Sequence, residues 1–425
     1  MGLKSIAAAL ALLLWTRSFA FAQTQKAVYA HFMVCRIDWS SPMLHGCAYA
    51  SLKVGIVENY TVDDWKADMA DAKAIGIDGF ALNCAPPRVD SYTPKQLANA
   101  YQAAGESDFK VFVSFDFAYW QNGMYSFFVR SLNYSSLPGQ AKWNGGAIAS
   151  TFVGEFFDWA PVKAVLPVTA LPMLEDPIQA TELHTSFDGA LSWYAWPTDG
   201  GNSIIPGPMT TIWDDKYFEW LAGKPYIMPV SPWFSTHFNS KNWVFVCEQL
   251  ITDRWNQVLA LKPQLVEILT WNDFGESHYI SGPQPHHSDD GSSQWAAGMP
   301  HDAPAPPAPT VDADGLVYWY RPTPKNTQCT NDTLPAPNGI NLLSDSVFVT
   351  TMLTSPATLT VTSGSLAPVS VNVGAGIVTS NFTMGVGIQT FAVTRNDAKI
   401  LGGDGGLKIT STCTTYNFNA YVGGF

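Results

Sequence analysis

The sequence predicts an α/β protein in two parts, a (β/α)8 TIM-type barrel followed by an antiparallel β-sandwich. From residue 26 to 274, short apolar runs alternate with longer helix-compatible stretches, a pattern typical of parallel βα units. A proline-rich patch at 303–309 then interrupts the pattern, because consecutive prolines lack N–H donors. Beyond it, Val, Thr and Gly alternate between turn residues, which is typical of a β-sandwich of about a hundred residues.

Eight apolar runs are the expected barrel strands. Their number, and the span of about 250 residues that they occupy, match a (β/α)8 barrel. Chemistry in such a barrel occurs at the carboxyl ends of the strands, so the residues that end or follow each run are the candidate functional residues. The predicted strands cover residues 27–34, 79–83, 110–117, 150–154, 165–171, 190–196, 226–232 and 265–271.

The stretch between the first two strands carries the clearest helix signal. Thr61 is a good N-cap, and Asp63 and Asp64 suit the positive end of the helix dipole. Apolar residues then recur at the helical period, at Trp65, Met69, Ala72 and Ile75. Further helices are predicted at residues 94–104 and 243–260.

The N-terminus predicts secretion. Lys4, an apolar run and the ending Ala20-Phe21-Ala22 form the pattern of a cleaved signal peptide, so an extracellular or cell-wall location is expected. No other run approaches about 18 apolar residues, so no membrane association is expected. The expected parts are a signal peptide at 1–22, a catalytic barrel at 23–302, a linker at 303–310 and a β-sandwich at 311–425.

The composition indicates a neutral or polar ligand. The formal net charge is −12, with 23 Lys and Arg against 35 acidic residues, which argues against a nucleic-acid partner. The 16 Trp residues suit stacking against sugar rings, although Trp can also simply fill a large core. The sequence has no phosphate loop or G-x-S-x-G motif, and its cysteine spacing suits no zinc site. We therefore expect a monomer that binds a polysaccharide and needs no cofactor or metal.

Six cysteines in a secreted chain are expected to pair at least partly. Cys329 and Cys413 are the only two in the predicted β-sandwich, so they are the disulfide candidates. Four N-x-S/T sequons mark candidate N-glycosylation sites, which are Asn59, Asn133, Asn331 and Asn381.

Two acidic residues directly follow the last predicted strand. The segment Trp271-Asn272-Asp273-Phe274-Gly275-Glu276-Ser277 places two carboxylates three positions apart on a loop, so both can point into one cleft. A pair of carboxyl groups, one protonated and one ionised, is what most glycosidases use. Asp273 and Glu276 are therefore the candidate catalytic residues. In the alternative interpretation, Asp273 caps a turn and Glu276 is a solvated charge.

Other acids and aromatic residues are candidates for substrate binding. Asp116 and Glu155 lie on the carboxyl side of their predicted strands, whereas Asp78 precedes its strand and is at least as easily a structural charge. His278 could orient Glu276 or bind a hydroxyl, although a lone His is more often a hydrogen-bonded scaffold residue. The remaining candidates are the aromatic, amide and imidazole groups beside these acids, namely Tyr119, Trp120, Trp193, Trp196, Trp233, His237, Trp271, Asn272 and Tyr279.

Several long strings in the chain resemble one known family. They lie at residues 31–34, 59–65, 78–83, 114–117, 192–196, 231–233 and 271–279, and in the C-terminal part from 318–322 to 416–418. With these strings, nearly the whole mature chain closely resembles the fungal α-1,3-glucanases, or mutanases, of glycoside hydrolase family 71.

The resemblance implies a (β/α)8 catalytic domain with an appended β-sandwich. It further implies a secreted, endo-acting hydrolase of α-1,3-glucan that inverts the anomeric carbon. The Asp and Glu of the family's W-N-D-x-G-E string are its expected catalytic pair, and they match Asp273 and Glu276. We assign Asp273 as the base and Glu276 as the acid. Inversion needs carboxyl groups about 6.5–9.5 Å apart, with room for a water molecule.

The chain departs from the family pattern in two places. Residues 35–53 are inserted after the first strand, and the proline-rich linker follows where the family tends to have an aromatic amphipathic helix over the last strand. Two alternatives stay open. Through these departures, the protein could be a catalytically impaired carbohydrate-binding protein of the cell wall. Separately, it could be a hydrolase of another α-glucan.

Overall fold

The structure is a computed structural model. It describes residues 26–34, 57–120, 132–175, 186–239, 241–282, 284–287 and 311–425. The predicted signal peptide, the insertion at 35–53 and the proline-rich linker lie outside the described residues.

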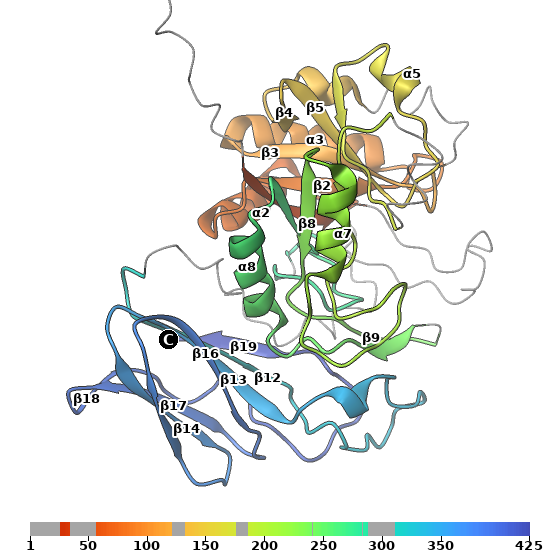
Figure 1. Ribbon diagram of the computed structural model, residues 1–425. Helices are drawn as coiled ribbons and strands as arrows, with labels where there is room; N and C mark the ends of the chain where they lie inside the picture. Colours follow the sequence, from red (N-terminus) through yellow and green to blue (C-terminus); the bar gives the residue numbers. More distant parts are fainter. Residues whose placement is uncertain are drawn as a thin grey trace, which may run out of the picture.

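The first part of the chain is built on a curled, mostly parallel sheet (Figure 1). Each of the eight predicted strands has a counterpart, although the fifth and sixth are much shorter than predicted. The fourth begins at Gly146 and pairs antiparallel with an unpredicted strand, β4 (Lys142–Trp143). The eight counterparts are β1 (Ala27–Met33), β2 (Gly79–Cys84), β3 (Lys110–Asp116), β5 (Gly146–Phe152), β6 (Val168–Ala170), β7 (Ala190–Leu191), β8 (Tyr226–Val230) and β11 (Leu265–Ile268).

The two edges of the curled sheet meet beside β6 and β7. The strand order is β4-β5-β3-β2-β1-β11-β8-β7, and β6 pairs with β5 at the opposite edge from β7. A single parallel bridge then joins Met173, just past β6, to Leu191 of β7. Leu191 donates its amide to Pro172 O at 2.9 Å and accepts from the amide of Leu174 at 3.0 Å.

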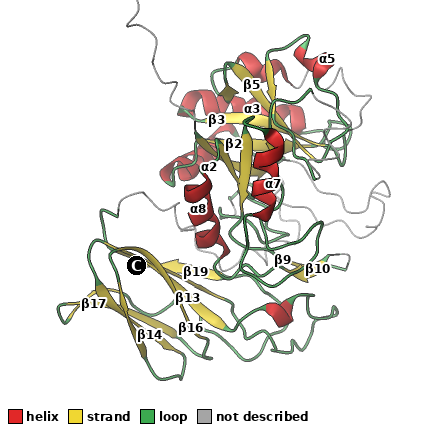
Figure 2. Ribbon diagram, viewed as in Figure 1, coloured by secondary structure: helices red, strands yellow, loops and turns green. Residues whose placement is uncertain are grey.

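Five helices lie around this sheet in the described residues (Figure 2). They follow β1, β2, β5, β7 and β8, so the described part of the chain has fewer helices than a full (β/α)8 unit. The predicted capping of the first helix is confirmed, because Thr61 and Asp64 cap each other in a capping box. The helices are α2 (Val62–Ala74), α3 (Thr93–Ser107), α5 (Ala160–Lys163), α7 (Ile212–Leu221) and α8 (Leu250–Leu261), and a 3-10 turn spans Leu132–Ser136.

The predicted helix at residues 243–260 is wrong at its start. Asn242–Val244 form a short strand, β10, that pairs antiparallel with β9 (Ser235–His237), and α8 begins only at Leu250. The aromatic and β-branched residues Trp243 to Val246 fit a pleated surface better than a helix. This hairpin stands beside the carboxyl end of the sheet and helps to form the site described below.

Successive side chains of β1 point alternately to the helices and to the inside of the curled sheet. Phe32 faces the helices and packs on Trp65 with ring centroids 4.6 Å apart. Tyr29 faces inward, where it meets Phe112 edge to face at 5.0 Å within an apolar inner cluster. Burying each such side chain stabilises the fold by about 1.5–3 kcal/mol. The same alternation turns His31 and Met33 toward the interior at the open end.

The C-terminal part consists of two antiparallel four-stranded sheets. Their orders are β16-β13-β12-β19 and β15-β14-β17-β18. They share an apolar core, in which Tyr318 stacks on Phe391 at 4.3 Å. A disulfide joins Cys329 to Cys413. The strands are β12 (Gly315–Tyr320), β13 (Ser346–Leu353), β14 (Ala357–Ser363), β15 (Val369–Val373), β16 (Gly376–Thr383), β17 (Gln389–Arg395), β18 (Ala398–Leu401) and β19 (Tyr421–Gly424), and a short 3-10 turn spans Ile340–Leu342.

The two-sheet unit packs against the loops that follow β7 and β8 (Figure 1). Trp319 donates its indole N–H to Glu248 O at 2.6 Å, and the indole of Trp233 donates to Phe418 O at 2.9 Å. Phe348 also belongs to the apolar cluster between the two parts. The C-terminal unit is therefore packed on the end of the parallel sheet where the predicted functional residues lie.

Candidate active site

A cavity of about 510 Å³ opens at the carboxyl ends of the parallel strands. Its walls come from most strands of the curled sheet and from the β9–β10 hairpin, so residues far apart in the sequence converge on it. Strand ends hold such residues more rigidly than loop tips do. Its lining includes His31, Met33, Asn83, Asp116, Tyr119, Phe152, Met173, Glu175, Trp193, Trp196, Phe234, Lys241, Trp243, Phe245, Asp273 and Glu276.

The loop after β11 is held by its own hydrogen bonds. The amide of Trp271 donates to His31 O at 2.7 Å, which ties the start of the loop to β1. The amide of Asp273 donates to Thr270 Oγ1 at 2.8 Å, and the amide of Glu276 donates to Asp273 Oδ1 at 3.0 Å. One oxygen of Asp273 therefore caps the turn, as the alternative interpretation predicted. The other oxygen faces the cavity side of the loop.

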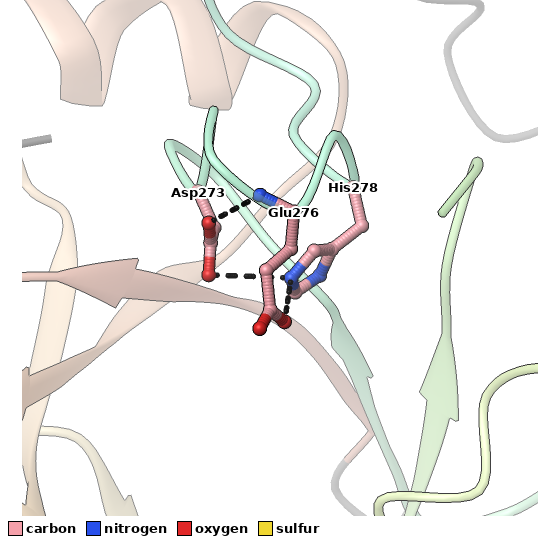
Figure 3. Close-up of side chains that lie close together, drawn as sticks. All are labelled: Asp273, Glu276 and His278. Atoms are coloured by element: carbon pink, nitrogen blue, oxygen red, sulfur yellow. Dashed lines mark hydrogen bonds and ion pairs between the residues drawn. The ribbon is translucent and has the colours of Figure 1, made fainter. Parts of the chain in front are cut away.

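His278 lies between the two candidate carboxylates (Figure 3). Its Nε2 is 3.3 Å from Asp273 Oδ2 and 3.1 Å from Glu276 Oε2. Burial alone would lower the pKa of His278, but the charge of Asp273 and the hydrogen bonds to both carboxylates raise it to about 9. The imidazole is therefore protonated at neutral pH and acts as a cation shared by both acids.

Lys241 binds Glu276 from the opposite side. The ammonium of Lys241 forms an ion pair with Glu276 Oε1. Burial would raise the pKa of Glu276, but the charge of Lys241 and the hydrogen bond and charge of His278 lower it to about 2. Both oxygens of Glu276 thus face a cation, and the carboxylate is ionised at neutral pH.

The Asp273, Glu276 and His278 cluster also has the composition of a metal site, since one ligand atom from each lies within 4.8 Å of the others. Lys241 and His278 already face the two carboxylates, so the cluster has positive charges close to both acids without a bound ion. We therefore base no step of the proposed reaction on a metal at this cluster.

A buried pair lies beside the cavity, and its histidine, His31, lines the wall. His31 Nδ1 lies 2.7 Å from Glu267 Oε1, and the two side chains are 1% and 0% exposed. Within the described part of the chain, His31 Nε2 and Glu267 Oε2 have no hydrogen-bond partner. The imidazole also meets Trp193 edge to face at 5.1 Å. An unsatisfied buried nitrogen on a cavity-lining residue is costly unless a ligand or water completes it.

Several predicted site residues do line the cavity. Asp116 accepts from the amide of Ala118 at 3.0 Å and from Asn83 Nδ2 at 3.3 Å, which fixes its carboxylate at the rim. The predicted residues that line the cavity are Asp116, Tyr119, Trp193, Trp196, Asp273 and Glu276.

The other predicted residues do not line this cavity, although His278 contacts two residues that do. Asp78 lies at the amino end of β2 and accepts from the amide of Val28 at 2.8 Å, as the structural interpretation predicted. Trp120, Trp233 and Trp271 are buried, and each indole N–H bonds to protein. Asn272 bonds both main-chain groups of Met33, Glu155 accepts from the Glu175 amide, and Tyr279 packs on Phe274. His237 turns toward the C-terminal unit.

Sequence reasoning missed Lys241 and the His31–Glu267 pair. Lys241 lies in the aromatic stretch after β8, where one of only 23 basic residues was the single available signal. A glutamate inside the apolar run Leu265-Val266-Glu267-Ile268 was a stronger signal, because an ionisable residue in a buried strand needs a partner. The identity of that partner depends on the pairing of β1 with β11.

Carboxylates and aromatic rings gathered in one cavity at the carboxyl ends of parallel strands are the arrangement of a glycoside hydrolase. Residues 24–425 match the family model described as Glycosyl hydrolase family 71. The chain therefore belongs to glycoside hydrolase family 71, as the resemblance predicted.

Curated relatives extend over most of the chain. It is 58% identical over 392 residues to "Mutanase Pc12g07500" of Penicillium rubens, an alignment that covers 88% of each chain. It is 35% identical over 409 residues to "Glucan endo-1,3-alpha-glucosidase agn1" of Schizosaccharomyces pombe, covering 87% of this chain and 92% of the relative. The ascus wall endo-1,3-alpha-glucanase of the same yeast is 26% identical over 95% of this chain and 98% of its own.

Similarity to solved structures is weaker. The GH99 endo-alpha-mannosidase from Bacteroides thetaiotaomicron superposes with a TM-score of 0.46 at 9% identity, covering 60% of this chain and 87% of that chain. A similarity of this size supports no inference about the substrate. None of the helices in the described ranges combines the length and apolar character that crossing a membrane requires.

Proposed function

We propose that this protein is a secreted, endo-acting hydrolase of the α-1,3-glucosidic linkages of α-1,3-glucan. The observation that carries the proposal is the position of Asp273 and Glu276, which line one cavity together with Trp193 and Trp196. Polysaccharide hydrolysis needs paired carboxyl groups and rings on which sugars stack. The names of the mutanase and glucan endo-1,3-alpha-glucosidase relatives support the α-1,3 linkage as the substrate.

Asp273 and Glu276 are the proposed catalytic pair, and the charges around them favour one order of roles. The assignment from the resemblance made Glu276 the acid. A general acid must carry a proton, whereas Lys241 and His278 hold Glu276 ionised. We therefore reverse the order. Glu276 acts as the base that activates water, and Asp273 passes to the departing glycosidic oxygen a proton that it receives from His278 Nε2, 3.3 Å away.

We propose inversion at the anomeric carbon, as the family resemblance implies. The nearest oxygens of the two carboxylates lie within 4.8 Å here, whereas inverting enzymes hold their carboxyl groups about 6.5–9.5 Å apart. Inversion therefore requires a glucosyl unit and a water molecule to separate the two carboxylates when the substrate binds.

The remaining cavity residues serve substrate binding in this proposal. Trp193, Trp196 and Tyr119 offer ring faces and edges to glucosyl units. Asp116 and Asn83, already hydrogen-bonded to each other, offer acceptor and donor atoms to sugar hydroxyls. Their mutual bond fixes their orientation before the substrate arrives.

The proposal also covers the architecture and location of the protein. We propose that the curled sheet is a (β/α)8 barrel and that the C-terminal unit is a β-sandwich. The bridge between Met173 and Leu191 supports closure, and the shared core of the two C-terminal sheets supports the sandwich. Secretion agrees with the four sequon asparagines, Asn59, Asn133, Asn331 and Asn381, which are all exposed.

Release of reducing sugar from α-1,3-glucan tests the function. We expect release by the wild type, and a loss of at least about 10²-fold in Asp273→Asn and Glu276→Gln. Glu219→Gln, which changes an exposed carboxylate on α7, is the matched control and should keep the normal rate. Binding to α-1,3-glucan without release by the wild type would favour a carbohydrate-binding protein instead. Release only from another α-glucan would favour the other alternative.

Two measurements test the roles and the stereochemistry. Proton NMR should detect the β-anomer as the first reducing end, and an α-anomer would contradict inversion. With an aryl oligosaccharide that has a good leaving group, Asp273→Asn should recover much of its rate, because such a group departs without a proton. Glu276→Gln should not recover. The opposite result would restore the order that the resemblance implied.

A further inference from the structure

Lys241 reaches Glu276 from a very short hairpin. The strands β9 and β10 pair through three residues each, with His237 opposite Asn242 and Ser235 opposite Val244. The amide of Ser235 also donates to Glu276 O at 3.1 Å, so the hairpin contacts both the main chain and the side chain of this residue. A two-stranded hairpin of this length is marginal by itself in water. Something else must hold Lys241 in place.

The C-terminal unit supplies that support. His237 Nε2 lies 2.8 Å from Asp332 Oδ2, and both side chains are only 6% exposed. His237 Nδ1 lies 2.8 Å from Asn242 Oδ1, and Asn242 Nδ2 donates to Pro335 O at 2.8 Å. A main-chain bond of 2.9 Å from the Val244 amide continues the contact to Asn338 O. The residues on both sides of Lys241 are thus tied to one loop of the two-sheet unit.

Asp332 is itself held firmly. It accepts from the amide of Tyr416 at 2.7 Å and from the amide of Leu334 at 3.0 Å. The disulfide between Cys329 and Cys413 joins the same two segments three residues away on each. A carboxylate fixed by two main-chain amides is a rigid acceptor for an imidazole.

We infer that Asp332 is a positioning residue for catalysis, which acts through His237 and Asn242 to hold Lys241 against Glu276. The inference rests on the proposed catalytic role of Glu276. The C-terminal unit would then contribute to the reaction through Asp332, although Asp332 does not line the cavity. It also explains why His237, predicted to bind sugar, turns away from the cavity.

The charge of Glu276 depends on few groups. Lys241 faces it from the hairpin, and His278 and Asp273 face it from its own loop. When Lys241 loses its position, His278 alone opposes the effect of burial, so the pKa of Glu276 rises. The acidic limb of the pH profile of kcat/KM then moves to higher pH, because this limb reports protonation of the base in the unliganded enzyme.

The experiment measures this limb for the full-length enzyme on a soluble α-1,3-gluco-oligosaccharide. We expect Lys241→Gln to move the limb upward by about one pH unit or more, a tenfold change in proton affinity. Asp332→Ala should move it in the same direction by a smaller amount. The double variant should move it no further than Lys241→Gln alone, because both changes remove the same ion pair.

Glu248→Ala is the matched control. Glu248 Oε1 accepts from the amide of Ser344 across the same interface, and among the described residues the side chain does not bond to the hairpin. Its loss should therefore lower the melting temperature without moving the limb. Asp332→Asn, which keeps an oxygen for His237, should recover part of the wild-type profile. A lower melting temperature with an unmoved limb in Asp332→Ala would overturn the inference.

A second readout does not need activity. Lys241 is 16% exposed, so acetylation by acetic anhydride should be slow in the wild type and several-fold faster in Asp332→Ala, with exposed Lys262 as the internal reference. An unchanged rate at Lys241 would overturn the inference. If the wild type releases no sugar, or if Glu276→Gln keeps its rate, the proposed function fails, whereas the acetylation result still decides whether Asp332 holds Lys241.

Discussion

Asp68 and Glu276 lie on opposite sides of the loop after β11, and their pKa values shift in opposite directions. The loop after β11 sends Glu276 into the cavity and Trp271 outward to Asp68 of α2, at 3.1 Å. Burial raises the pKa of Asp68 to about 7, because its partners Trp271, Tyr60 and Gln284 are neutral donors that offset only part of this effect. Glu276 meets two cations, and its pKa falls to about 2. The charge of the partners, more than burial, decides which acid is ionised.

Glu267 is a third buried acid, and its one partner among the described residues is His31. We expect the largest effect when this partner is removed. His31→Phe leaves Glu267 buried without a partner and should lower the free energy of unfolding by about 3–5 kcal/mol. The double variant His31→Phe/Glu267→Leu should recover most of that loss, as measured by urea unfolding. Hydrolysis should stay impaired in both. Full activity in the double variant would show that the pair serves stability alone.

His278→Gln removes one of the two cations from the catalytic loop while keeping a side chain that can donate a hydrogen bond. We expect kcat/KM to fall by about 10²-fold, because both carboxylates lose their shared cation. His286→Gln is the control, since His286 pairs with Asp64 on the exposed surface. If both variants lose activity equally, the charge of His278 is not what matters.

Asp68→Asn tests the other side of the comparison. In the wild type, the folded state keeps a proton on Asp68 up to pH about 7, whereas the unfolded state loses it near its ordinary pKa. The unfolded state then binds fewer protons, so stability falls as the pH rises from about 4 to 7, by about 1–3 kcal/mol. Asp68→Asn should remove this decline. Asp63→Asn, which changes an exposed acid in the first turn of α2, should keep it.

Local signals predicted the parts of the fold that depend on near neighbours in the chain. The capping box of Thr61 and Asp64 and most of the strand starts needed only a few residues of context. The catalytic loop was also visible, since two acids follow a buried strand. The start of α8 was mispredicted because Trp243 and its neighbours pair with β9 and pack against distant side chains.

The contacts that set the charges of the site were not visible in the sequence. Lys241 and Glu276 are 35 positions apart, His31 and Glu267 are 236 apart, and His237 and Asp332 are 95 apart. Such pairs form only through the tertiary packing of the strands and of the two parts of the chain. The residue types of the site could therefore be predicted better than the protonation states that the site needs.

The junction of β6 and β7 is held by a shorter ladder than the pair β2 and β3. The amides of Leu174, Asp188, Gly189 and Leu191 donate across this junction, and Met173 beside them lines the cavity. Neighbouring parallel strands such as β2 and β3 share six register positions, so their separation would break a longer ladder. Hydrogen exchange at Leu174 and Leu191 should accordingly be faster than at Phe112 and Ser114 of β3, whose amides face β2 as that of Lys110 does. Of these two ladders, the one beside Met173 therefore has fewer hydrogen bonds to break if a bound polymer displaces the cavity wall.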